Sequence, residues 1–390
     1  MKVVLIGNYA ADRQESMLRF GELMRQELSA RGVSVHWLQP APRLGGQRTG
    51  SAFVNKWLAY VDKLVIFPRR QVFRALRRAD SKTVVHICDH SNGVYLPSLP
   101  GVKSVVTCHD LLAVRSARGE FPENPTSRTG LLLQNMILDG LGQARRVVCV
   151  SEQTRQDVLR LTSLQSDQVK LVANGLNHAY SPMNPSVALS RVEGLLRQRG
   201  IEDPQLVFGS GGCLLHVGGN SWYKNRPSVV RMYERLVELM PNAPPLVMVG
   251  RSLPPFWRAW IDTRGLARRI HVIDQVANED LRALYSIARA LVFPSLAEGF
   301  GWPIIEAQAC GCPVITTPWS PMREVGGDAA FYCNPHNFSE GAMLIRNLLA
   351  HWDRESTTLR QQSVTNAARF TTPKMIEGYM DVYQELLRSN

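Results

Sequence analysis

Short runs of apolar residues alternate with helical stretches along most of the chain. The apolar runs are rich in valine and isoleucine and do not alternate with polar residues, which is typical of strands buried on both faces of a parallel sheet. They fall at residues 1–7, 33–38, 83–88, 103–110, 145–151 and 169–175, and again at 213–219, 245–251, 269–274, 290–295 and 313–317. An amphipathic segment follows the first run, at about residues 15–31. The pattern therefore predicts an α/β fold made of two doubly wound domains.

The two groups of apolar runs are separated by a stretch rich in proline and glycine at residues 182–212. Such a composition is typical of a hinge region. We therefore expect a first domain at residues 1–195 and a second domain at residues 205–372. The last segment, residues 374–390, has a helical pattern, and we expect this helix to pack back on the first domain.

The chain carries a positive charge that is unevenly distributed. Its formal net charge is +12, and the first 190 residues hold 24 of the 45 lysines and arginines but only 14 of the 33 acidic residues. This asymmetry indicates an anionic partner for the first domain, and nucleic acid, anionic lipid and a phosphorylated substrate all fit it. No apolar run approaches the roughly 18–20 residues that span a bilayer, and the N-terminal run is shorter than a signal-peptide core. We expect a cytoplasmic protein, either free or bound at the inner face of the membrane.

Seven cysteines are scattered through the chain, mostly one to a predicted strand. The one close pair, Cys310 and Cys312, has no second pair or nearby histidine that would complete a metal site. We therefore expect buried free thiols.

The most informative pattern lies at residues 290–317, which read as strand, loop, helix and strand. Pro303 suits the first turn of the helix, and Gly311 suits the position just after its end. A right-handed crossover between parallel strands places the loop at the carboxyl ends of the strands, where open α/β sheets bind ligands. Gly299 and Gly301 would let a ligand approach the backbone, and the helix N-terminus would favour an anion.

Two glutamates accompany this loop. Glu298 precedes the helix, and Glu306 lies about one turn inside it. Their different depths argue against the two carboxylates about 5 Å apart that a retaining glycoside hydrolase uses. The pattern favours two acceptors for hydroxyl groups of two different sugars. The alternative is an ordinary helix-capping loop with a surface glutamate.

The spacing Glu298-x7-Glu306, with Gly-Phe-Gly after the first glutamate, resembles the signature of glycosyltransferase family 4. The resemblance covers nearly the whole chain and is strongest at residues 214–317. It implies the GT-B fold, in which two Rossmann-like domains face each other across a cleft, and transfer with retention of the anomeric configuration. It also implies that Glu298 binds hydroxyls of the transferred sugar, that Glu306 binds the nucleotide ribose, and that the amides of Phe300 to Trp302 lie near the sugar and the diphosphate.

A second element opens the second domain, where a strand ends at Gly218-Gly219 and a helix follows. By the same resemblance, Gly219 belongs to the donor site and Lys224 neutralises the donor diphosphate. Most family members have Gly-Arg or a similar pair where this chain has Gly218-Gly219. The residue that supplies the second cation is therefore undecided between Arg226 and Arg251. Each of them could equally be a solvated surface arginine.

In the first domain, His109 and Asp110 stand at the end of a predicted strand. The resemblance implies that His109 approaches the transferred sugar, while a capped turn is the alternative. Gly7 ends the first strand, and by resemblance its loop would face the donor diphosphate or the acceptor. Ser151 and Asn174 are further family landmarks that we interpret as structural.

The chain contains no Asp-x-Asp sequence, which many transferases use to hold a divalent metal. We therefore expect neither a metal nor another cofactor, with Lys224, an arginine and the helix N-terminus near Gly301 acting as fixed electrostatic stabilisers. No carboxylate nucleophile is evident, so we favour same-face attack in which the departing phosphate accepts the proton. The expected substrates are a nucleotide diphosphate sugar, of mannose or glucose by family frequency, and a glycan or lipid-linked glycan acceptor.

Residues 63–82, in a region that matches the family little, hold seven lysines and arginines with apolar residues between them. A helix with basic and apolar faces suits a membrane surface with anionic lipid. The alternative is a solvated helix whose apolar side packs on the sheet.

Three rival functions fit parts of the sequence. A nicotinamide-dependent oxidoreductase should carry Gly-x-Gly-x-x-Gly after the first strand, and only Gly7 is there. A nucleic-acid-binding or scaffolding protein would use the positive charge, but the chain shows no motif of that kind, and we expect no nucleic acid partner. A sugar-nucleotide epimerase with the same GT-B architecture stays open.

Overall fold

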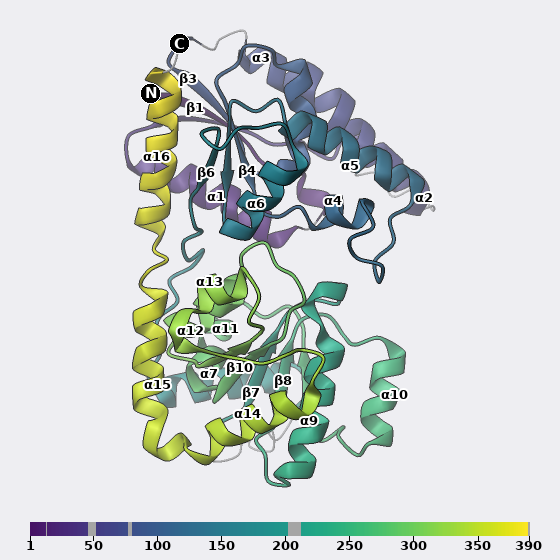
Figure 1. The fold of residues 1–390 in the computed structure, drawn as a ribbon, viewed down its shortest axis with the longest axis vertical. Coiled ribbons are helices and arrows are strands. Elements are labelled where there is room, and N and C mark those ends of the chain that lie inside the picture. The colour runs from purple at the N-terminus through teal and green to yellow at the C-terminus, as the bar shows by residue number, and fades with distance from the viewer. Residues whose placement is uncertain (13, 46–51, 77–79, 202–211, 389–390) are drawn as a thin grey trace. The chain divides into compact units, whose positions relative to one another are not determined.

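The structure is a computed structural model that describes residues 1–390 except 13, 46–51, 77–79, 202–211 and 389–390. The chain forms two compact units (Figure 1). Unit 1 comprises residues 1–177 and 372–390, and unit 2 comprises residues 178–371. Each unit contains a six-stranded sheet in which all paired strands are parallel, flanked by helices. The two-domain α/β fold predicted from the apolar runs is confirmed.

The sheet of unit 1 has the strand order β2-β1-β3-β4-β5-β6. Its strands are β1 (Lys2–Ile6), β2 (Ser34–Leu38), β3 (Thr83–Ile87), β4 (Ser104–Cys108), β5 (Arg146–Cys149) and β6 (Val169–Leu171). The α-helices of this unit are α1 (Glu15–Ala30), α2 (Ala52–Val61), α3 (Phe73–Leu76), α4 (Leu112–Ala117), α5 (Arg128–Leu141), α6 (Glu152–Leu161) and α16 (Thr372–Arg388). Short turns of other helix types are η1 (Ala10–Asp12), η2 (Asp62–Ile66), η3 (Pro68–Val72) and η4 (His90–Ser98).

The sheet of unit 2 has the order β12-β11-β10-β7-β8-β9. Its strands are β7 (Leu214–Val217), β8 (Leu246–Val249), β9 (Ile270–Ile273), β10 (Ala290–Phe293), β11 (Val314–Thr316) and β12 (Ala330–Tyr332). Its helices are α7 (Pro185–Gln198), η5 (Trp222–Lys224), α9 (Arg226–Leu239), α10 (Pro255–Thr263), α11 (Asn278–Ile287), α12 (Trp302–Ala309), α13 (Met322–Gly326), η6 (Gly327–Ala329), α14 (Phe338–Ala350) and α15 (Trp352–Ala367). The apolar pattern did not predict β12.

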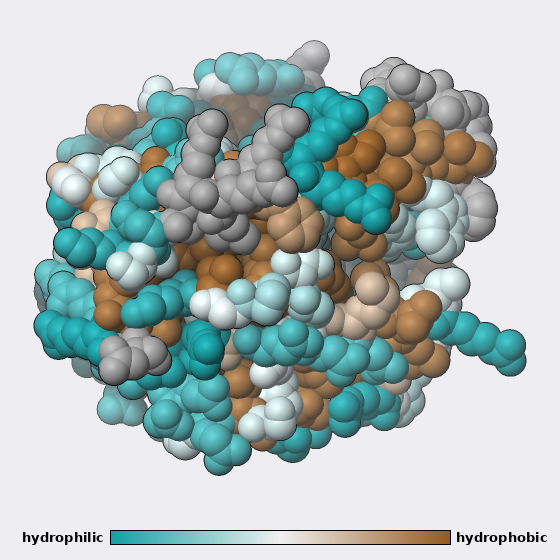
Figure 2. All heavy atoms as spheres, turned by 90° about the horizontal axis from the view of Figure 1, so that it is seen from above, coloured by the Kyte–Doolittle hydropathy of each residue, from teal (hydrophilic) through white to brown (hydrophobic). Residues whose placement is uncertain are grey.

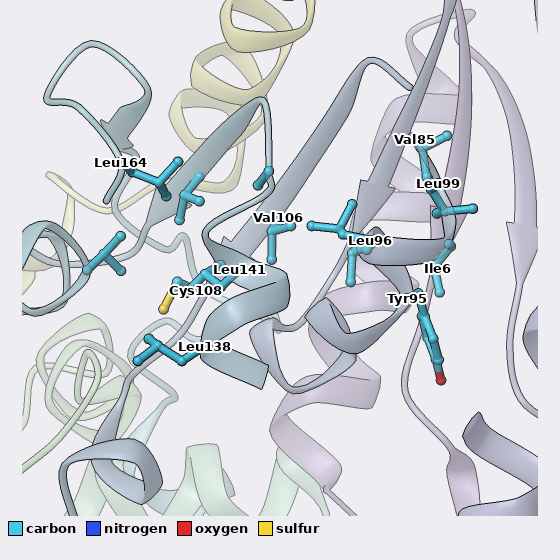
Figure 3. Packing of buried hydrophobic residues seen from close by; sticks show 14 of the residues in the cluster. Ile6, Val85, Tyr95, Leu96, Leu99, Val106, Cys108, Leu138, Leu141 and Leu164 are labelled. Atoms are coloured by element: carbon cyan, nitrogen blue, oxygen red, sulfur yellow. The ribbon is translucent and has the colours of Figure 1, made fainter. Parts of the chain in front are cut away.

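One cluster of buried apolar side chains in unit 1 lies between its sheet and the helices on one side of it. Val85, Val106 and Cys108 come from the middle of the sheet and are fully buried. In Figure 3, Leu138 and Leu141 of α5 lie beside Cys108. Strands β3 and β4 are buried at every position, which explains why their sequences lack alternation.

The boundary between the units lies after residue 177, and not at residues 195–205 as the composition suggested. Residues 178–195 belong to unit 2 because α7 packs against α11. Arg191 Nε pairs with Asp280 Oδ1 at 2.6 Å, and the Met183 amide donates to Ser286 Oγ at 3.1 Å. Because this stretch contains many prolines and glycines, its composition did not reveal the apolar face through which α7 packs on unit 2.

Helix α16 packs along β3 and β5 of unit 1, as the yellow helix in Figure 1 shows. Tyr379 and Tyr383 of this helix are buried. The hydroxyl of Tyr383 bonds to His86 Nδ1 at 2.7 Å, and that of Tyr379 bonds to Thr107 Oγ1 at 2.9 Å. The second ring nitrogen of His86 bonds to Thr107 at 2.8 Å. Burial lowers the pKa of His86 to about 3, so this network holds a neutral imidazole.

The structure also bears on the cysteines and on membrane-spanning segments. All seven cysteines are buried free thiols, as expected. Across the described part of the chain, no helix is both long and apolar enough to cross a membrane.

Candidate active site

The central strands of unit 2 define its ligand-binding edge. The chain leaves β7 toward β8 and β9 on one side and later returns on the other side as β10, so the strand order reverses between β7 and β10. Ligands of open α/β sheets bind at this kind of switch point, outside the carboxyl ends of the strands. The loop after β7 and the loop after β10 meet there. The Leu296 amide donates to Tyr223 O at 2.8 Å, and Asn225 Nδ2 donates to Pro294 O at 3.0 Å.

An ion pair joins these two loops. Lys224 Nζ lies 2.7 Å from Glu298 Oε1, and the two side chains are only 16% and 9% exposed. Burial by itself would lower the pKa of Lys224, but the Glu298 carboxylate raises it above its ordinary value. Lys224 Nζ also lies 5.0 Å from the centre of the Phe293 ring. The family resemblance assigned Lys224 to the donor diphosphate and Glu298 to the transferred sugar. The structure places the two side chains in direct contact.

Helix α12 begins where the loop after β10 ends. Gly301 is its N-cap residue with a φ of 98°, a left-handed conformation that favours glycine. Gly311 follows its C-terminus with a φ of 74°, as expected for a residue just after a helix end. The Phe300 side chain is buried against Trp302 and Phe370. The backbone of Phe300, and not its side chain, is therefore the part that could contact a ligand.

Glu306 lies one turn inside α12 and is buried. Its Oε2 accepts a hydrogen bond from the Tyr285 hydroxyl at 3.1 Å. The pKa of Tyr285 is raised well above its ordinary value, first by burial and then by the Glu306 carboxylate. The same carboxylate contributes to the raised pKa of Lys224. This location excludes the alternative of a surface glutamate.

The two candidate arginines lie in different environments. Arg226 is 2% exposed, and its Nη1 donates to Asn220 Oδ1 at 2.5 Å and to Arg251 O at 2.6 Å. Its Nε and Nη2 are buried and have no hydrogen-bond partner among the described residues. Burial lowers the pKa of Arg226 to about 10. Arg251 is exposed, and it contributes its backbone carbonyl to this arrangement.

Glycines shape the edge beside these cations. Gly219 has open space where a Cβ would point. Gly250, with a φ of 143°, follows β8, and a Cβ there would collide with the Gly218 carbonyl. Gly219 was predicted from the sequence as part of the donor site, but Gly250 was not. Its role depends on the close approach of β7 and β8, which no local pattern reveals.

Two buried polar side chains at this edge were not predicted from the sequence. His216 Nδ1 bonds to Val292 O at 2.9 Å, and burial lowers its pKa to about 3. His216 Nε2 and the Ser295 hydroxyl have no hydrogen-bond partner among the described residues. Both residues lie in or just after apolar strands and give no motif signal.

Gly7 and His109 lie in unit 1, at the ends of β1 and β4. A Cβ at Gly7 would collide with the indole of Trp37, so packing alone explains this glycine. His109 is buried, and its Nε2 bonds to Cys88 O at 3.0 Å. Its pKa is lowered, chiefly by burial. Asp110 Oδ1 accepts from the Leu112 amide at 2.9 Å near the start of α4, a turn contact of the kind that the alternative interpretation describes.

Unit 2 thus gathers two cations and two carboxylates at one sheet edge, next to a helix N-terminus. Lys224 and Arg226 suit an anion, and Glu298 and Glu306 suit hydroxyl groups. Within the described ranges, no group of three or more histidines, cysteines, aspartates or glutamates is arranged to hold a metal ion.

Comparisons with known proteins agree with this arrangement. The family model described as glycosyl transferases group 1 matches residues 201–369, and the model of glycosyltransferase family 4 matches residues 22–180. The chain is 28% identical to O-antigen chain mannosyltransferase B of Escherichia coli over 83% of this chain and 79% of that protein. It is 23% identical to the serotype-specific mannosyltransferase WbdA of Escherichia coli over 74% of this chain but only 34% of the longer relative.

Among solved structures, HepE of Anabaena in complex with UDP and glucose superimposes with a TM-score of 0.70. It shares 16% sequence identity with this chain, and the match covers 98% of each chain. The fold and the matches define the protein as a glycosyltransferase with the GT-B fold. More narrowly, it is a glycosyltransferase of the family 4 type.

Proposed function

We propose that this enzyme transfers a hexose from a nucleotide diphosphate sugar to a hydroxyl of a glycan or lipid-linked glycan, with retention of the anomeric configuration and without a metal ion. The observation that carries the proposal is the buried Lys224–Glu298 pair beside the N-terminus of α12. HepE, which shares the fold, was solved with UDP and glucose, and this supports a nucleotide-sugar donor. Two mannosyltransferases among the relatives favour mannose over glucose.

Each charged group has a role in this proposal. Lys224 and the amides at the start of α12 stabilise the charge that develops on the β-phosphate. Arg226 is favoured over Arg251 as the second cation, because two of its buried nitrogens have no partner among the described residues. Glu298 accepts from hydroxyls of the transferred sugar, and Glu306 accepts from the ribose.

The reaction follows from these charges. Departure of the nucleoside diphosphate leaves positive charge on the anomeric carbon and negative charge on the β-phosphate. We propose that the acceptor oxygen attacks the same face of the sugar. The new bond joins that oxygen to the anomeric carbon, the bond to the phosphate oxygen breaks, and the acceptor proton passes to the departing phosphate.

The stereochemistry of the product tests this proposal. The protein is incubated with GDP-mannose or UDP-glucose, methyl α-D-mannopyranoside and excess EDTA, and the product is examined by NMR. We expect an α-linked disaccharide and an equal amount of released nucleoside diphosphate. A β-linked product would exclude retention, and a donor isomerised without acceptor would identify an epimerase. A requirement for added divalent metal would contradict the electrostatic role of Lys224.

We further propose that unit 1 docks on a membrane containing anionic lipid. Val54, Trp57 and Val61 of α2 and Val65 of η2 are 37–48% exposed, and their spacing of three, four and four residues places them along one side of a helical segment. Lys56, Arg69 and Arg70 are exposed nearby in the chain. Tryptophan and valine with flanking basic residues suit the interface of an anionic bilayer.

This surface differs from the segment 63–82 proposed from the sequence. Val72 is buried, and Lys63 pairs with Asp12 at 2.7 Å, so only part of that segment is available. Arg77 and Arg78 lie outside the described residues. Figure 2 looks down on unit 1 and shows a hydrophobic area bordered by hydrophilic side chains on the side where α2 lies in Figure 1.

Co-sedimentation with vesicles tests the docking. We expect the wild type to bind phosphatidylglycerol vesicles and not phosphatidylcholine vesicles, and Trp57→Ser to weaken binding about tenfold or more, because a buried tryptophan contributes at least ~1.5 kcal/mol at an interface. Phe256→Ser is the matched control, since Phe256 is 67% exposed on α10 of unit 2. If the wild type stays in solution, or if Trp57→Ser and Phe256→Ser bind alike, the docking surface is wrong.

A further inference from the structure

The two cations of the site in unit 2 are separated by one residue, Asn225. Lys224 is the last residue of the turn η5, and Arg226 is the first residue of helix α9. Asn225 joins the two with a φ of 51° and a ψ of 40°, a left-handed conformation that asparagine tolerates better than most residues do. The chain therefore changes direction between the cations, and they belong to two different helical segments.

The side chain of Asn225 ties this turn to the loop after β10. Asn225 is 8% exposed, and its Nδ2 donates to Pro294 O at 3.0 Å. Its Oδ1 accepts from Ser228 Oγ at 2.8 Å, which orients the amide so that its nitrogen faces Pro294. Pro294 directly follows β10, and the loop that begins there carries Glu298. Asn225 is therefore attached to the loop that holds the partner of Lys224.

A second hydrogen bond joins the same two loops. The Leu296 amide donates to Tyr223 O at 2.8 Å, so the bonds between the loops lie on both sides of Lys224 in the sequence. Lys224 Nζ lies 2.7 Å from Glu298 Oε1. A lysine side chain is flexible, so an ion pair fixes the position of its ammonium group only where the two backbones are themselves fixed.

A helix-capping role does not explain the side chain of Asn225. An asparagine at the N-cap position usually accepts a hydrogen bond from the amide of the second or third helical residue. Among the described residues, the Asn225 side chain makes no such bond in α9. Asn337, by contrast, caps α14 in the usual way by accepting from the Glu340 amide at 3.1 Å. The side chain of Asn225 thus serves the contact between the two loops.

Lys224 depends on this contact more than Arg226 does. Besides Glu298, the Lys224 ammonium group lies 5.0 Å from the centre of the Phe293 ring. Both of these neighbours belong to β10 or to the loop after it. Arg226 has supports of its own, among them a bond from Nη1 to Asn220 Oδ1 at 2.5 Å. The position of the Lys224 ammonium group is therefore set by the way in which its own loop is attached to the β10 side.

We propose that Asn225 is a positioning residue that holds Lys224 in place for the diphosphate of the donor. The proposal rests on the function proposed above, in which Lys224 binds that diphosphate. Asn225 acts through Lys224 and does not itself contact the ligand. The left-handed turn gives the lysine its place in the chain, and the bond to Pro294 fixes this turn against the loop of Glu298.

Calorimetric titration with GDP, UDP and ADP in excess EDTA tests the proposal without an acceptor. Asn225→Gly keeps the left-handed conformation available and removes both side-chain bonds. It should bind the preferred nucleoside diphosphate about tenfold more weakly, as when one charge-assisted hydrogen bond is lost. In a Lys224→Met Glu298→Gln background, Asn225→Gly should change the affinity less than about twofold, because the group that it positions is gone.

Two further variants separate positioning from folding. Asn337→Gly is the matched control, since it removes an asparagine from the N-cap of α14, and it should bind as the wild type does. Ser228→Ala suits a helix and removes only the bond that orients the amide of Asn225. It should weaken binding about two- to threefold, and only where Lys224 is present. Thermal unfolding of each variant reports its stability separately.

The outcomes are distinct. If none of the three nucleoside diphosphates binds the wild type, the proposed function fails before Asn225 is tested. If Lys224→Met Glu298→Gln binds as tightly as the wild type, the role of Lys224 fails and Asn225 has nothing to position. If Lys224 matters but Asn225→Gly binds as the wild type does, or weakens binding equally in both backgrounds, the proposal is overturned. Should Asn225→Gly fail to fold, wild-type affinity in Ser228→Ala would overturn it as well.

Discussion

Lys224→Met should lower kcat about 100- to 1,000-fold, the usual effect of removing one fixed electrostatic stabiliser of a developing anion. Methionine retains most of the aliphatic length of lysine and lacks the charge. The Michaelis constant for the donor should rise much less, because the charge on the β-phosphate grows mainly as the bond breaks. The measurement is steady-state release of nucleoside diphosphate with the methyl mannoside acceptor.

Two further variants separate catalysis from folding. Lys224→Met leaves Glu298 buried without its cation, which destabilises a folded protein by about 3–5 kcal/mol. Glu298→Gln added to Lys224→Met should restore most of that stability without restoring turnover. Lys170→Met is the matched control, since Lys170 pairs with Glu385 at 2.8 Å in unit 1. A Lys224→Met enzyme that is folded and keeps kcat within threefold of wild type would show that the lysine is structural.

Glu306→Gln should weaken binding of the nucleoside diphosphate about 10- to 100-fold, because a charge-assisted hydrogen bond is worth ~1.5–3 kcal/mol. Glutamine fits the buried position in α12 and can still accept from the Tyr285 hydroxyl, so the fold should persist. The amide offers one acceptor oxygen where the carboxylate offers two for the ribose diol. Calorimetric titration measures the loss.

The nucleotide itself provides the control for this prediction. A 2′,3′-dideoxy nucleoside diphosphate lacks the hydroxyls that Glu306 would bind, so Glu306→Gln should bind it as well as wild type does. Tyr285→Phe should weaken binding only a few-fold, since it removes one contact to the carboxylate and keeps the charge. Equal losses for the ribose and dideoxy ligands would mean that Glu306 supports the fold of the site and does not bind the ribose.

Much of the fold could be predicted from the sequence, because the apolar runs reflect a local property of the chain. A strand buried on both faces has to be apolar at successive positions, as in β3 and β4. The predicted domain boundary lies too far along the chain. Composition shows where prolines and glycines are frequent, but it does not show which helix α7 packs against. The apolar stripe on α2 was missed for a similar reason, since exposure is a property of the folded unit.

The candidate site could be predicted only in part. Pro303, Gly301 and Gly311 follow from the rules of helix ends, and the carboxyl edge follows from the handedness of the crossover. The contact between Lys224 and Glu298 spans 74 positions, so spacing along the chain could not show it. The burial of Arg226 depends on neighbours that are distant in sequence, and no motif carries that information.

The most direct test of the account is a calorimetric titration of the purified protein with GDP-mannose, UDP-glucose and ADP-glucose in excess EDTA, with Glu306→Gln measured alongside. The account predicts that one of these sugars binds the wild type with a micromolar dissociation constant and binds the variant at least tenfold more weakly. Absence of binding by all three, or equal binding by the two proteins, would contradict the donor site at the edge between β7 and β10.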